Sequence, residues 1–277
     1  MLKYNESMAS HCSLRTGGFA QTLFIPESVQ ILVDFLKTNT QPILFVGLGS
    51  NLLIRDPGFE GVIIKLTQLN LLTLDHSSVT AEAGVTLAKL SRIALANNLH
   101  GAEFLSAIPG TVGGALAMNA GAFGSEFWQF VAYVQTINRS GELFQRSVKE
   151  FSVNYRQVIP AHKDEFFISA ELVFNAKPSD KNIKQLLSQR NASQPIGLPN
   201  CGSVFKNPKN HYAAKLIEQS QLKGYCIGGA CISEKHANFI INNNHATASD
   251  VEKLILHIQQ VVKLNFDIDL EAELKII

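Results

Sequence analysis

The sequence predicts an α+β fold on the basis of three observations. Apolar residues recur at helical spacing in 25–39 and 86–98. Short apolar runs between glycine-rich or polar turns, as in 43–54, are typical of strands. From about residue 179 the chain becomes polar and rich in loops, which indicates a domain boundary near residue 178. A chain of 277 residues is long enough for roughly two or three small domains.

The part before that boundary is expected to alternate helices with short strands. Pro26 suits the start of the first helix, and Ser140 and Gly141 suit the turn of a hairpin. The expected elements are helices in 25–39 and 86–98, strands in 43–46, 52–54, 61–66, 71–85 and 166–174, and a hairpin over 131–147.

The part after the boundary is expected to hold three helices around a proline-rich loop. Thr247 with Asp250 three residues later resembles a capping box, which starts the most strongly periodic helix. The expected elements are helices in 179–191, 212–220 and 247–266, a loop in 194–208, and strands in 231–244 and 267–277.

Composition excludes several classes of protein. The net charge is +1 and no basic run occurs, which disfavours nucleic-acid binding through phosphates. No apolar run is long enough to span a bilayer, and the first residues lack the apolar core of a signal peptide. Cys12, Cys201, Cys226 and Cys231 form no C-x-x-C pair, so no disulfide framework or structural metal is expected. We expect a soluble cytoplasmic protein that binds no membrane.

The stretch "AIPGTVGGALAMNAGAFG", residues 107–124, contains five glycines and five alanines and no charge. It is too glycine-rich for a stable helix and too small-sided for a packed strand. A closely packed buried crossover is one interpretation. Ligand contact is favoured, because glycine lets a ligand approach the backbone, and Thr111, Asn119 and Ser125 offer side-chain hydrogen bonds.

A second glycine turn, "GLGSN" at 47–51, follows an apolar strand. Its bare N–H groups suit a phosphate, although such a turn alone is more often a simple strand connection. It is no Rossmann fingerprint, because Leu52 stands where the third glycine belongs, and no P-loop lysine follows. Two glycine-rich loops in one chain suggest a ligand with two polar ends, such as a dinucleotide.

Four further groups are weak signals when each is taken alone. Arg156, after Tyr155, is a natural clamp for a carboxylate but equally a surface charge. Ser203 follows a glycine in "CGSVFKNP", which by spacing is only a turn. Glu271 and Glu273 share one side of the expected last strand, and His236 lies between charged neighbours; both are typical of surfaces.

Taken together and in this order, these motifs resemble the UDP-N-acetylenolpyruvoylglucosamine reductase (MurB) family. The resemblance covers most of the chain. It rests on "LRTGGFA", "FVGLGSNLLIRDPGFEGVII", "IPGTVGGALAMNAGA", "YR", "GSVFKNP", "AAKLIE", "SEKHANFIIN" and "LEAEL". The combination of "IPGTVGGA", "MNAGA" and "GSVFKNP" is specific to that family.

The resemblance implies an FAD-binding fold of the vanillyl-alcohol oxidase (PCMH) type in two subdomains, 1–66 and 67–178, and a C-terminal α/β substrate domain, 179–277. FAD would be bound non-covalently, with its pyrophosphate along the glycine-rich loops. The chain resembles the shorter form of the family, which lacks a tyrosine-bearing insertion, and we expect a monomer. The implied cofactor-binding residues are Gly47, Leu48, Gly49, Ser50, Asn51, Leu52, Pro109, Gly110, Thr111, Gly113, Gly114, Asn119, Ala120, Gly121 and Ala122.

The implied reaction has two halves: NADPH reduces FAD, and hydride then passes to the enolpyruvyl group of UDP-N-acetylglucosamine enolpyruvate, giving UDP-N-acetylmuramate for peptidoglycan. By resemblance, Arg156 and Glu273 surround the enol and its carboxylate, and Ser203 donates the proton to C2. Substrate binding falls to Tyr155, Lys206 and Asn207.

The sequence departs from the family pattern at Leu48, Ala107, Val158 and Ala272, and none of these replaces an implied catalytic side chain. Two other functions are alternatives. A different flavin oxidoreductase of the same fold, such as an alcohol oxidase, would not need Ser203, Arg156 and Glu273 together. A non-enzymatic nucleotide-binding or scaffold protein would be colourless.

Overall fold

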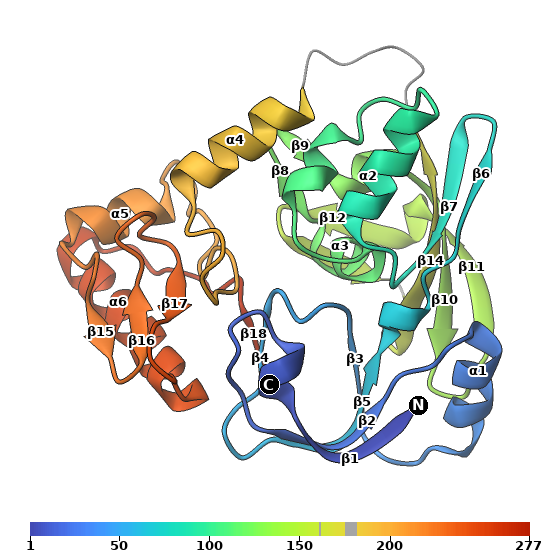
Figure 1. Cartoon of the computed structure of the whole chain (residues 1–277), viewed down its shortest axis with the longest axis horizontal. Coiled ribbons are helices and arrows are strands. Elements are labelled where there is room, and N and C mark those ends of the chain that lie inside the picture. Colours follow the sequence, from blue (N-terminus) through green and yellow to red (C-terminus); the bar gives the residue numbers. More distant parts are fainter. Residues whose placement is uncertain (161, 175–181) are drawn as a thin grey trace. The chain divides into compact units, whose positions relative to one another are not determined.

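The structure, a computed structural model, describes residues 1–160, 162–174 and 182–277. It divides into two compact units, each built from separate stretches of chain (Figure 1). The first unit comprises Met1–Lys3, Leu23–Leu48 and Val62–Gln189, and the second comprises Tyr4–Thr22, Gly49–Gly61 and Arg190–Ile277. The boundary expected between residues 178 and 179 lies outside the described residues.

Four elements contain a point at which the chain passes from one unit to the other: β1 (Leu2–Ser7), β2 (Phe19–Phe24), β5 (Phe59–Lys65) and α4 (Ile183–Ser193). The other elements of the first unit are α1 (Val29–Thr38), β3 (Ile43–Val46), β6 (Leu72–Asp75), β7 (Ser78–Glu82), α2 (Leu87–Ala96), α3 (Val112–Met118), β8 (Gly121–Ala122), β9 (Ser125–Glu126), β10 (Val131–Asn138), β11 (Leu143–Ser147), β12 (Phe151–Asn154), β13 (Gln157–Pro160) and β14 (Glu165–Val173).

The centre of the first unit is an antiparallel sheet in the order β11-β10-β14-β7-β6 (Figure 1). Alternate residues of a strand point to opposite faces, but the pairing of β10 with β14 shifts register between Gln135 and Thr136. Ile168 and Ala170 therefore belong to different apolar clusters although they are two residues apart. Val134 and Ala170 belong to the cluster that contains α2 and α3. Ile137 and Ile168 belong to the cluster that contains α1. Both faces of the sheet are thus covered by helices.

The second unit is built around α6 (Ala248–Phe266). Val251, Leu254, Ile255 and Ile258 lie on one face of this helix and are almost fully buried, together with Phe205. The remaining elements are β4 (Leu52–Leu53), α5 (Ala213–Gln219), β15 (Cys226–Ile227), β16 (Ala230–Ile232), β17 (Ile240–Asn242) and β18 (Lys275–Ile276). Strands β15, β16 and β17 form one small sheet, and β18 pairs in parallel with β4.

The strongly patterned elements agree with the sequence predictions. Helices α1, α2 and α6 lie within the expected ranges, and the capping box at Thr247 and Asp250 is present. The hairpin of β10 and β11 also forms, with Ile137 opposite Leu143. The helix expected over 179–191 begins, within the described residues, at Ile183; residues 179–181 lie outside them.

Two expected strands differ from the prediction. The stretch 231–244 contains two short strands, β16 and β17, because the backbone turns between Ser233 and Phe239. In the terminal stretch only Lys275–Ile276 forms a strand, and Ala272 contributes a single bridge to Phe205. Both differences arise from tertiary pairing, which alternation of residue types along the chain does not reveal.

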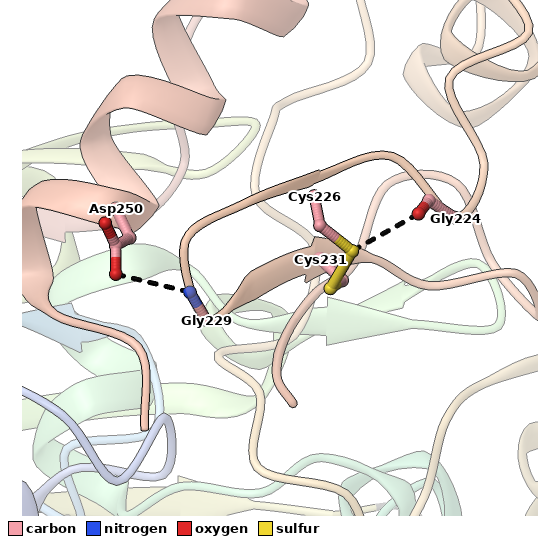
Figure 2. The surroundings of a disulfide bond; sticks show 5 residues. All are labelled: Gly224, Cys226, Gly229, Cys231 and Asp250. Carbon is pink, nitrogen blue, oxygen red and sulfur yellow. Dashed lines mark hydrogen bonds between the residues drawn. A yellow bond between two sulfur atoms is a disulfide. The ribbon is translucent and has the colours of Figure 1, made fainter. Parts of the chain in front are cut away.

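The cysteines require a correction. Cys226 and Cys231 form a disulfide, which Figure 2 shows, although the absence of a C-x-x-C pair suggested none. They face one another across the β15–β16 hairpin with their Cα atoms 4.1 Å apart. Cys12 and Cys201 are buried thiols.

Within the described ranges, no helix has both the length and the apolar character needed to cross a membrane.

Candidate functional site

Part of the glycine-rich stretch is helical, so the prediction that it forms no helix is wrong. Helix α3 spans Val112–Met118. Thr111 caps its start by accepting a hydrogen bond from the N–H of Gly114 at 3.4 Å, and Asn119 ends it in the left-handed conformation. Val112, Ala115 and Leu116 are buried in the core of the first unit. Packing and caps therefore offset the low helix propensity of the two glycines.

Gly113 and Gly114 are adjacent but have different surroundings. A Cβ on Gly113 would lie 2.9 Å from the Cβ of Ala83, and the N–H of Gly113 donates to the carbonyl of Ala83 at 2.9 Å. Packing therefore explains why residue 113 is small. A Cβ on Gly114 would meet only Thr111 Oγ1, at 3.8 Å, and Gly114 is exposed. Within the part of the chain that the structure describes, no contact requires glycine at 114, and the exposed backbone there can be approached by a ligand.

The two glycine-rich segments meet at Gly47 and Thr111. A Cβ on Gly47 would lie 2.5 Å from Thr111 Oγ1, which is too close for any side chain. Gly47 directly follows β3, and Thr111 caps α3. The sequence predicts that both segments line one ligand, and the first unit does bring these parts of them together.

The rest of the glycine turn belongs to the second unit. The N–H of Ser13 donates to the carbonyl of Gly49 at 3.0 Å, and Ser13 Oγ donates to the carbonyl of Ser50 at 3.3 Å. Asn51 Nδ2 donates to the carbonyl of Glu273 at 3.0 Å. Asn51 Oδ1 is buried and has no hydrogen-bond partner within the described part of the chain. A buried acceptor of this kind requires a donor, which a bound ligand can supply.

The other expected cofactor-binding positions differ in accessibility. Leu48 and Pro109 are exposed, and Gly110, Ala120, Gly121 and Ala122 are partly buried. Leu52 is 7% exposed and its backbone pairs with Lys275 of β18, so little of this residue is available to a ligand. Thr111 and Asn119 are buried, and their side chains bond within the protein.

Asn119 supports the next part of the site. Its Nδ2 donates to Glu126 Oε2 at 2.9 Å and to the carbonyl of Asn154 at 3.2 Å. Its Oδ1 accepts from the N–H of Trp128 at 3.3 Å. The Asn119 side chain is therefore committed to holding the end of the glycine-rich stretch against strand β12.

Tyr155 and Arg156 form the two-residue turn between β12 and β13, in which Asn154 pairs with Gln157. Arg156 has a positive φ of 54°. It donates from Nη1 to the carbonyl of Asn119 at 3.2 Å and from Nη2 to that of Gly121 at 2.6 Å. Its guanidinium also lies 5.0 Å from the centre of the Tyr155 ring. The guanidinium is thus held at the end of the glycine-rich stretch.

Sequence reasoning did not identify this hairpin. A signal for the first strand was present, because apolar Phe151 and Val153 alternate with polar residues before the turn. Apolar residues also follow the turn, at Val158 and Ile159. The turn lacks the Asn-Gly or Asp-Gly pair that usually marks a two-residue hairpin loop.

In the second unit, the Ser203 loop lies beside the segment that carries Glu273. The carbonyl of Val204 accepts from the N–H of Glu273 at 2.7 Å, and the N–H of Lys206 donates to the carbonyl of Glu271 at 2.9 Å. Ser203 itself is partly exposed. The two residues therefore lie on neighbouring backbone segments although they are far apart in the sequence.

Lys206 and Asn207 both have protein partners. Lys206 Nζ forms an ion pair with Glu271 Oε1 at 2.5 Å, on a surface where Glu271 is largely exposed. Asn207 Oδ1 accepts from the N–H of Ala213 at 3.0 Å and so holds the start of α5. The structure places both residues directly after the Ser203 loop, as the sequence order requires.

Burial shifts the pKa of two further groups of the second unit, Cys201 and His236. Burial raises the pKa of the Cys201 thiol to about 12, and the negative charge of Glu273 acts in the same direction. Burial also lowers the pKa of His236 below its usual value. His236 was expected at the surface, but it is only partly exposed, and its Nδ1 accepts from the N–H of Asn238 at 3.2 Å.

Comparisons with known proteins cover the whole chain. Residues 23–147 match the family model of an FAD binding domain, and residues 194–277 match that of the UDP-N-acetylenolpyruvoylglucosamine reductase C-terminal domain. The UDP-N-acetylenolpyruvoylglucosamine reductase of Coxiella burnetii is 44% identical, over 99% of this chain and 94% of its own length. That of Legionella pneumophila is 47% identical, over 100% and 92%.

The chain belongs to the UDP-N-acetylenolpyruvoylglucosamine reductase family. The crystal structure of the Thermus caldophilus UDP-N-acetylenolpyruvylglucosamine reductase (MurB) agrees, with a TM-score of 0.84 and 28% identity over 100% of this chain and 98% of that one. The expected resemblance is confirmed, and so is the FAD-binding fold.

The residues present fit the FAD that the family binds. The matched FAD-binding region contains Gly47, Thr111 and the open position at Gly114. Uncharged backbone N–H groups can hold a pyrophosphate without cationic side chains, which agrees with the neutral composition of residues 107–124.

Proposed function

We propose that the protein reduces UDP-N-acetylglucosamine enolpyruvate to UDP-N-acetylmuramate for peptidoglycan precursor synthesis, with FAD as cofactor and NADPH as hydride donor. The observation that carries this proposal is the match to reductases of that name over essentially the whole chain. Two contacts support it: the Arg156 guanidinium donates to the carbonyl of Gly121, and the N–H of Glu273 donates to the carbonyl of Val204, the residue after Ser203.

Bound FAD supplies hydride transfer, first from NADPH and then to C3 of the enolpyruvyl group. Arg156 binds the substrate carboxylate and stabilises the negative charge that develops there. A preorganised charge in a site that excludes water typically contributes about 3 kcal/mol to such a step. The carbonyls of Asn119 and Gly121 fix the direction of the guanidinium before substrate binds.

Ser203 donates its hydroxyl proton to C2, and Glu273 acts beside it at the enol. A serine hydroxyl is a weak acid in water, but the acceptor carbon is strongly basic and binding fixes the geometry. The hydrogen bond from the Glu273 N–H to the Val204 carbonyl keeps the two residues on adjacent segments. Tyr155, Lys206 and Asn207 position the substrate.

We also propose which parts of the chain bind FAD and which bind the substrate. Residues 1–66 and 67–178 form the two FAD-binding subdomains, and residues 179–277 form the substrate domain. The FAD-binding match at 23–147 and the C-terminal match at 194–277 support this order. We further propose a cytoplasmic monomer, since its two substrates, NADPH and a sugar nucleotide, are cytoplasmic metabolites.

The test is an anaerobic assay of the purified protein. A yellow protein whose NADPH oxidation requires UDP-N-acetylglucosamine enolpyruvate is the expected result. Mass spectrometry should find UDP-N-acetylmuramate in amounts equal to the NADPH consumed. A colourless protein would contradict the FAD proposal. Hydrogen peroxide formation in air from an alcohol, without reduction of the sugar nucleotide, would favour the alcohol oxidase alternative.

A further inference from the structure

We propose that Asn238 is the positioning residue that sets the location of the Ser203 hydroxyl. The proposal rests on the proposed function, which makes Ser203 the proton donor. Asn238 is 4% exposed. Its Oδ1 accepts from the N–H of Phe205 at 3.0 Å, and its Nδ2 donates to the carbonyl of Phe205 at 2.8 Å. Its backbone carbonyl accepts from the N–H of Val204 at 2.9 Å.

These three hydrogen bonds hold the two residues that directly follow Ser203. Val204 is held on both sides, because its N–H donates to Asn238 and its carbonyl accepts from Glu273. On the other side of Ser203, Gly202 has a positive φ of 77°, and a Cβ there would meet no atom within 4 Å. On that side the N–H of Gly202 donates to Asn200 Oδ1 at 2.9 Å, which is a bond within the loop itself. The bonds that tie Ser203 to the turn at Asn238 and to the Glu273 segment lie on its C-terminal side.

Asn238 is itself held in place by the turn between β16 and β17. The N–H of Asn238 donates to His236 Nδ1 at 3.2 Å, and the N–H of Ser233 donates to the carbonyl of Phe239 at 2.8 Å. The Phe205 side chain is 1% exposed and anchors the loop in the core of the second unit. The turn between β16 and β17 is thus joined to the residues after Ser203 by the side chain and the backbone carbonyl of Asn238.

The role requires the chemistry of an amide. The buried N–H and carbonyl of Phe205 need an acceptor and a donor at once, and the Asn side chain supplies both. A carboxylate at 238 supplies only acceptors, so it would face the Phe205 carbonyl without a proton between them. Protonation of that carboxylate restores a donor. In Asn238→Asp, the hydrogen bond to the Phe205 carbonyl should therefore be present at low pH and lost at high pH.

The matched control is Asn242, another amide in the second unit that bonds to backbone. Its Nδ2 donates to the carbonyl of Leu14 at 3.0 Å, and its Oδ1 accepts from the N–H of Ala246 at 2.9 Å. Its side chain makes none of the hydrogen bonds that hold Val204 and Phe205, although its backbone N–H donates to the carbonyl of Pro199 at 3.0 Å. Asn242→Asp thus disturbs an equivalent pair of bonds elsewhere.

The experiment measures the two half-reactions of the FAD-loaded enzyme by anaerobic stopped-flow absorbance. In Asn238→Asp, reduction by NADPH should stay within about twofold of wild type. Reoxidation by UDP-N-acetylglucosamine enolpyruvate should slow by about 10 to 100-fold, since a misplacement of about 1 Å can cost 10² in rate. The reoxidation rate relative to wild type should recover as the pH falls. Asn242→Asp should show neither the selective slowing nor the recovery.

A double variant tests whether Asn238 acts through Ser203. In a Ser203→Ala background, Asn238→Asp should cause no further slowing of reoxidation, because the group it positions is gone. If Asn238→Asp does not fold, Asn238→Ser takes its place, since a hydroxyl keeps one of the two bonds to Phe205. Equal slowing of both half-reactions, or additive effects in the double variant, would overturn the positioning role.

Different results would contradict the proposed function and the positioning role of Asn238. If wild type does not reoxidise with the enolpyruvyl substrate, the proposed function fails and the role of Asn238 falls with it. If wild type reoxidises normally and Asn238→Asp is equally fast, the proposed function stands and only the positioning role is wrong.

Discussion

The guanidinium of Arg156 donates to the carbonyl of Gly121 at 2.6 Å, and a Cβ added to Gly121 would lie 3.0 Å from Arg156 Nη1. The same Cβ would lie 2.7 Å from the carbonyl oxygen of Ser125. Gly121 is therefore small because an arginine and a backbone carbonyl lie against it. One glycine of the stretch thus makes room for the side chain that we propose to bind the substrate carboxylate.

Gly121→Ala should displace the Arg156 guanidinium while leaving the FAD content unchanged. Because Arg156 is proposed to bind the substrate carboxylate, the KM for the enolpyruvyl substrate should rise and flavin reoxidation should slow, each by about tenfold, the factor that a loss of about 1.4 kcal/mol gives. Steady-state kinetics and stopped-flow absorbance measure both effects. Gly124→Ala is the control, since its Cβ would meet no atom within 4 Å although its φ is positive. An equal loss in the control would show that the contact with Arg156 is not the cause.

Gly113→Val should lower the stability of the protein, whereas Gly114→Val should lower its FAD content. Val at 113 would overlap Ala83, so the unfolding temperature of the apoprotein should fall, with a cost of about 1 to 3 kcal/mol. Val at 114 enters open space, so the circular dichroism of the apoprotein should stay unchanged while the FAD content of the purified protein falls at least tenfold. Full flavin absorbance in Gly114→Val would show that FAD does not pass this position.

The sequence predicted the elements whose signals are local. Helix α6 has both an apolar face and a capping box at Thr247 and Asp250, and both are read directly from residue spacing. Helix α3 was missed because its stability comes from the core it packs against, whereas its two glycines oppose a helix locally. Motifs likewise indicated Arg156 and Ser203. The roles of both stay predictions. Asn119 and Asn238, which we propose to position them, bond to backbone groups distant in sequence, and no local pattern reveals such bonds.

The disulfide was missed for a different reason: Cys226 and Cys231 are only five residues apart, but their spacing alone does not show that the β15–β16 hairpin brings them opposite one another. Figure 2 shows the Gly229 N–H at the hairpin turn bonded to Asp250 of α6, at 3.3 Å. The hairpin is therefore also held by hydrogen bonds that do not depend on the disulfide.

Mild reduction should make the thiol of Cys226 available to alkylation in the native protein, because Cys226 is exposed, whereas Cys231 is 7% exposed and should react more slowly. Cys12 and Cys201 should remain unlabelled until the protein unfolds, because both are buried and the pKa of Cys201 is raised to about 12. The disulfide closes a ring of only a few residues, so its loss should lower the free energy of unfolding by about 2 kcal/mol or less. Mass spectrometry of the alkylated peptides and thermal unfolding with and without reductant check both statements. Rapid native labelling of Cys201 would contradict the first.

Ser203→Ala should separate the two half-reactions. Ser203 has no part in hydride transfer from NADPH, so flavin reduction should stay within about threefold of wild type. Reoxidation needs the proton at C2, and loss of a general acid typically costs about 10² to 10⁴ in rate. Single-turnover absorbance changes of the flavin measure each half on its own.

Arg156→Ala is the informative comparison for Ser203→Ala. Removal of the guanidinium leaves the substrate carboxylate without its partner, so binding should weaken as well as reoxidation. Ser203→Ala should leave substrate binding nearly unchanged, because its hydroxyl acts on the reacting carbon and the loop is held by the backbone bonds of Val204 and Phe205. Titration of the oxidised enzyme with the substrate, followed by flavin absorbance, measures that affinity directly. If Ser203→Ala slowed both half-reactions equally, or weakened binding as much as Arg156→Ala does, Ser203 would be a binding residue and the proton would come from another group.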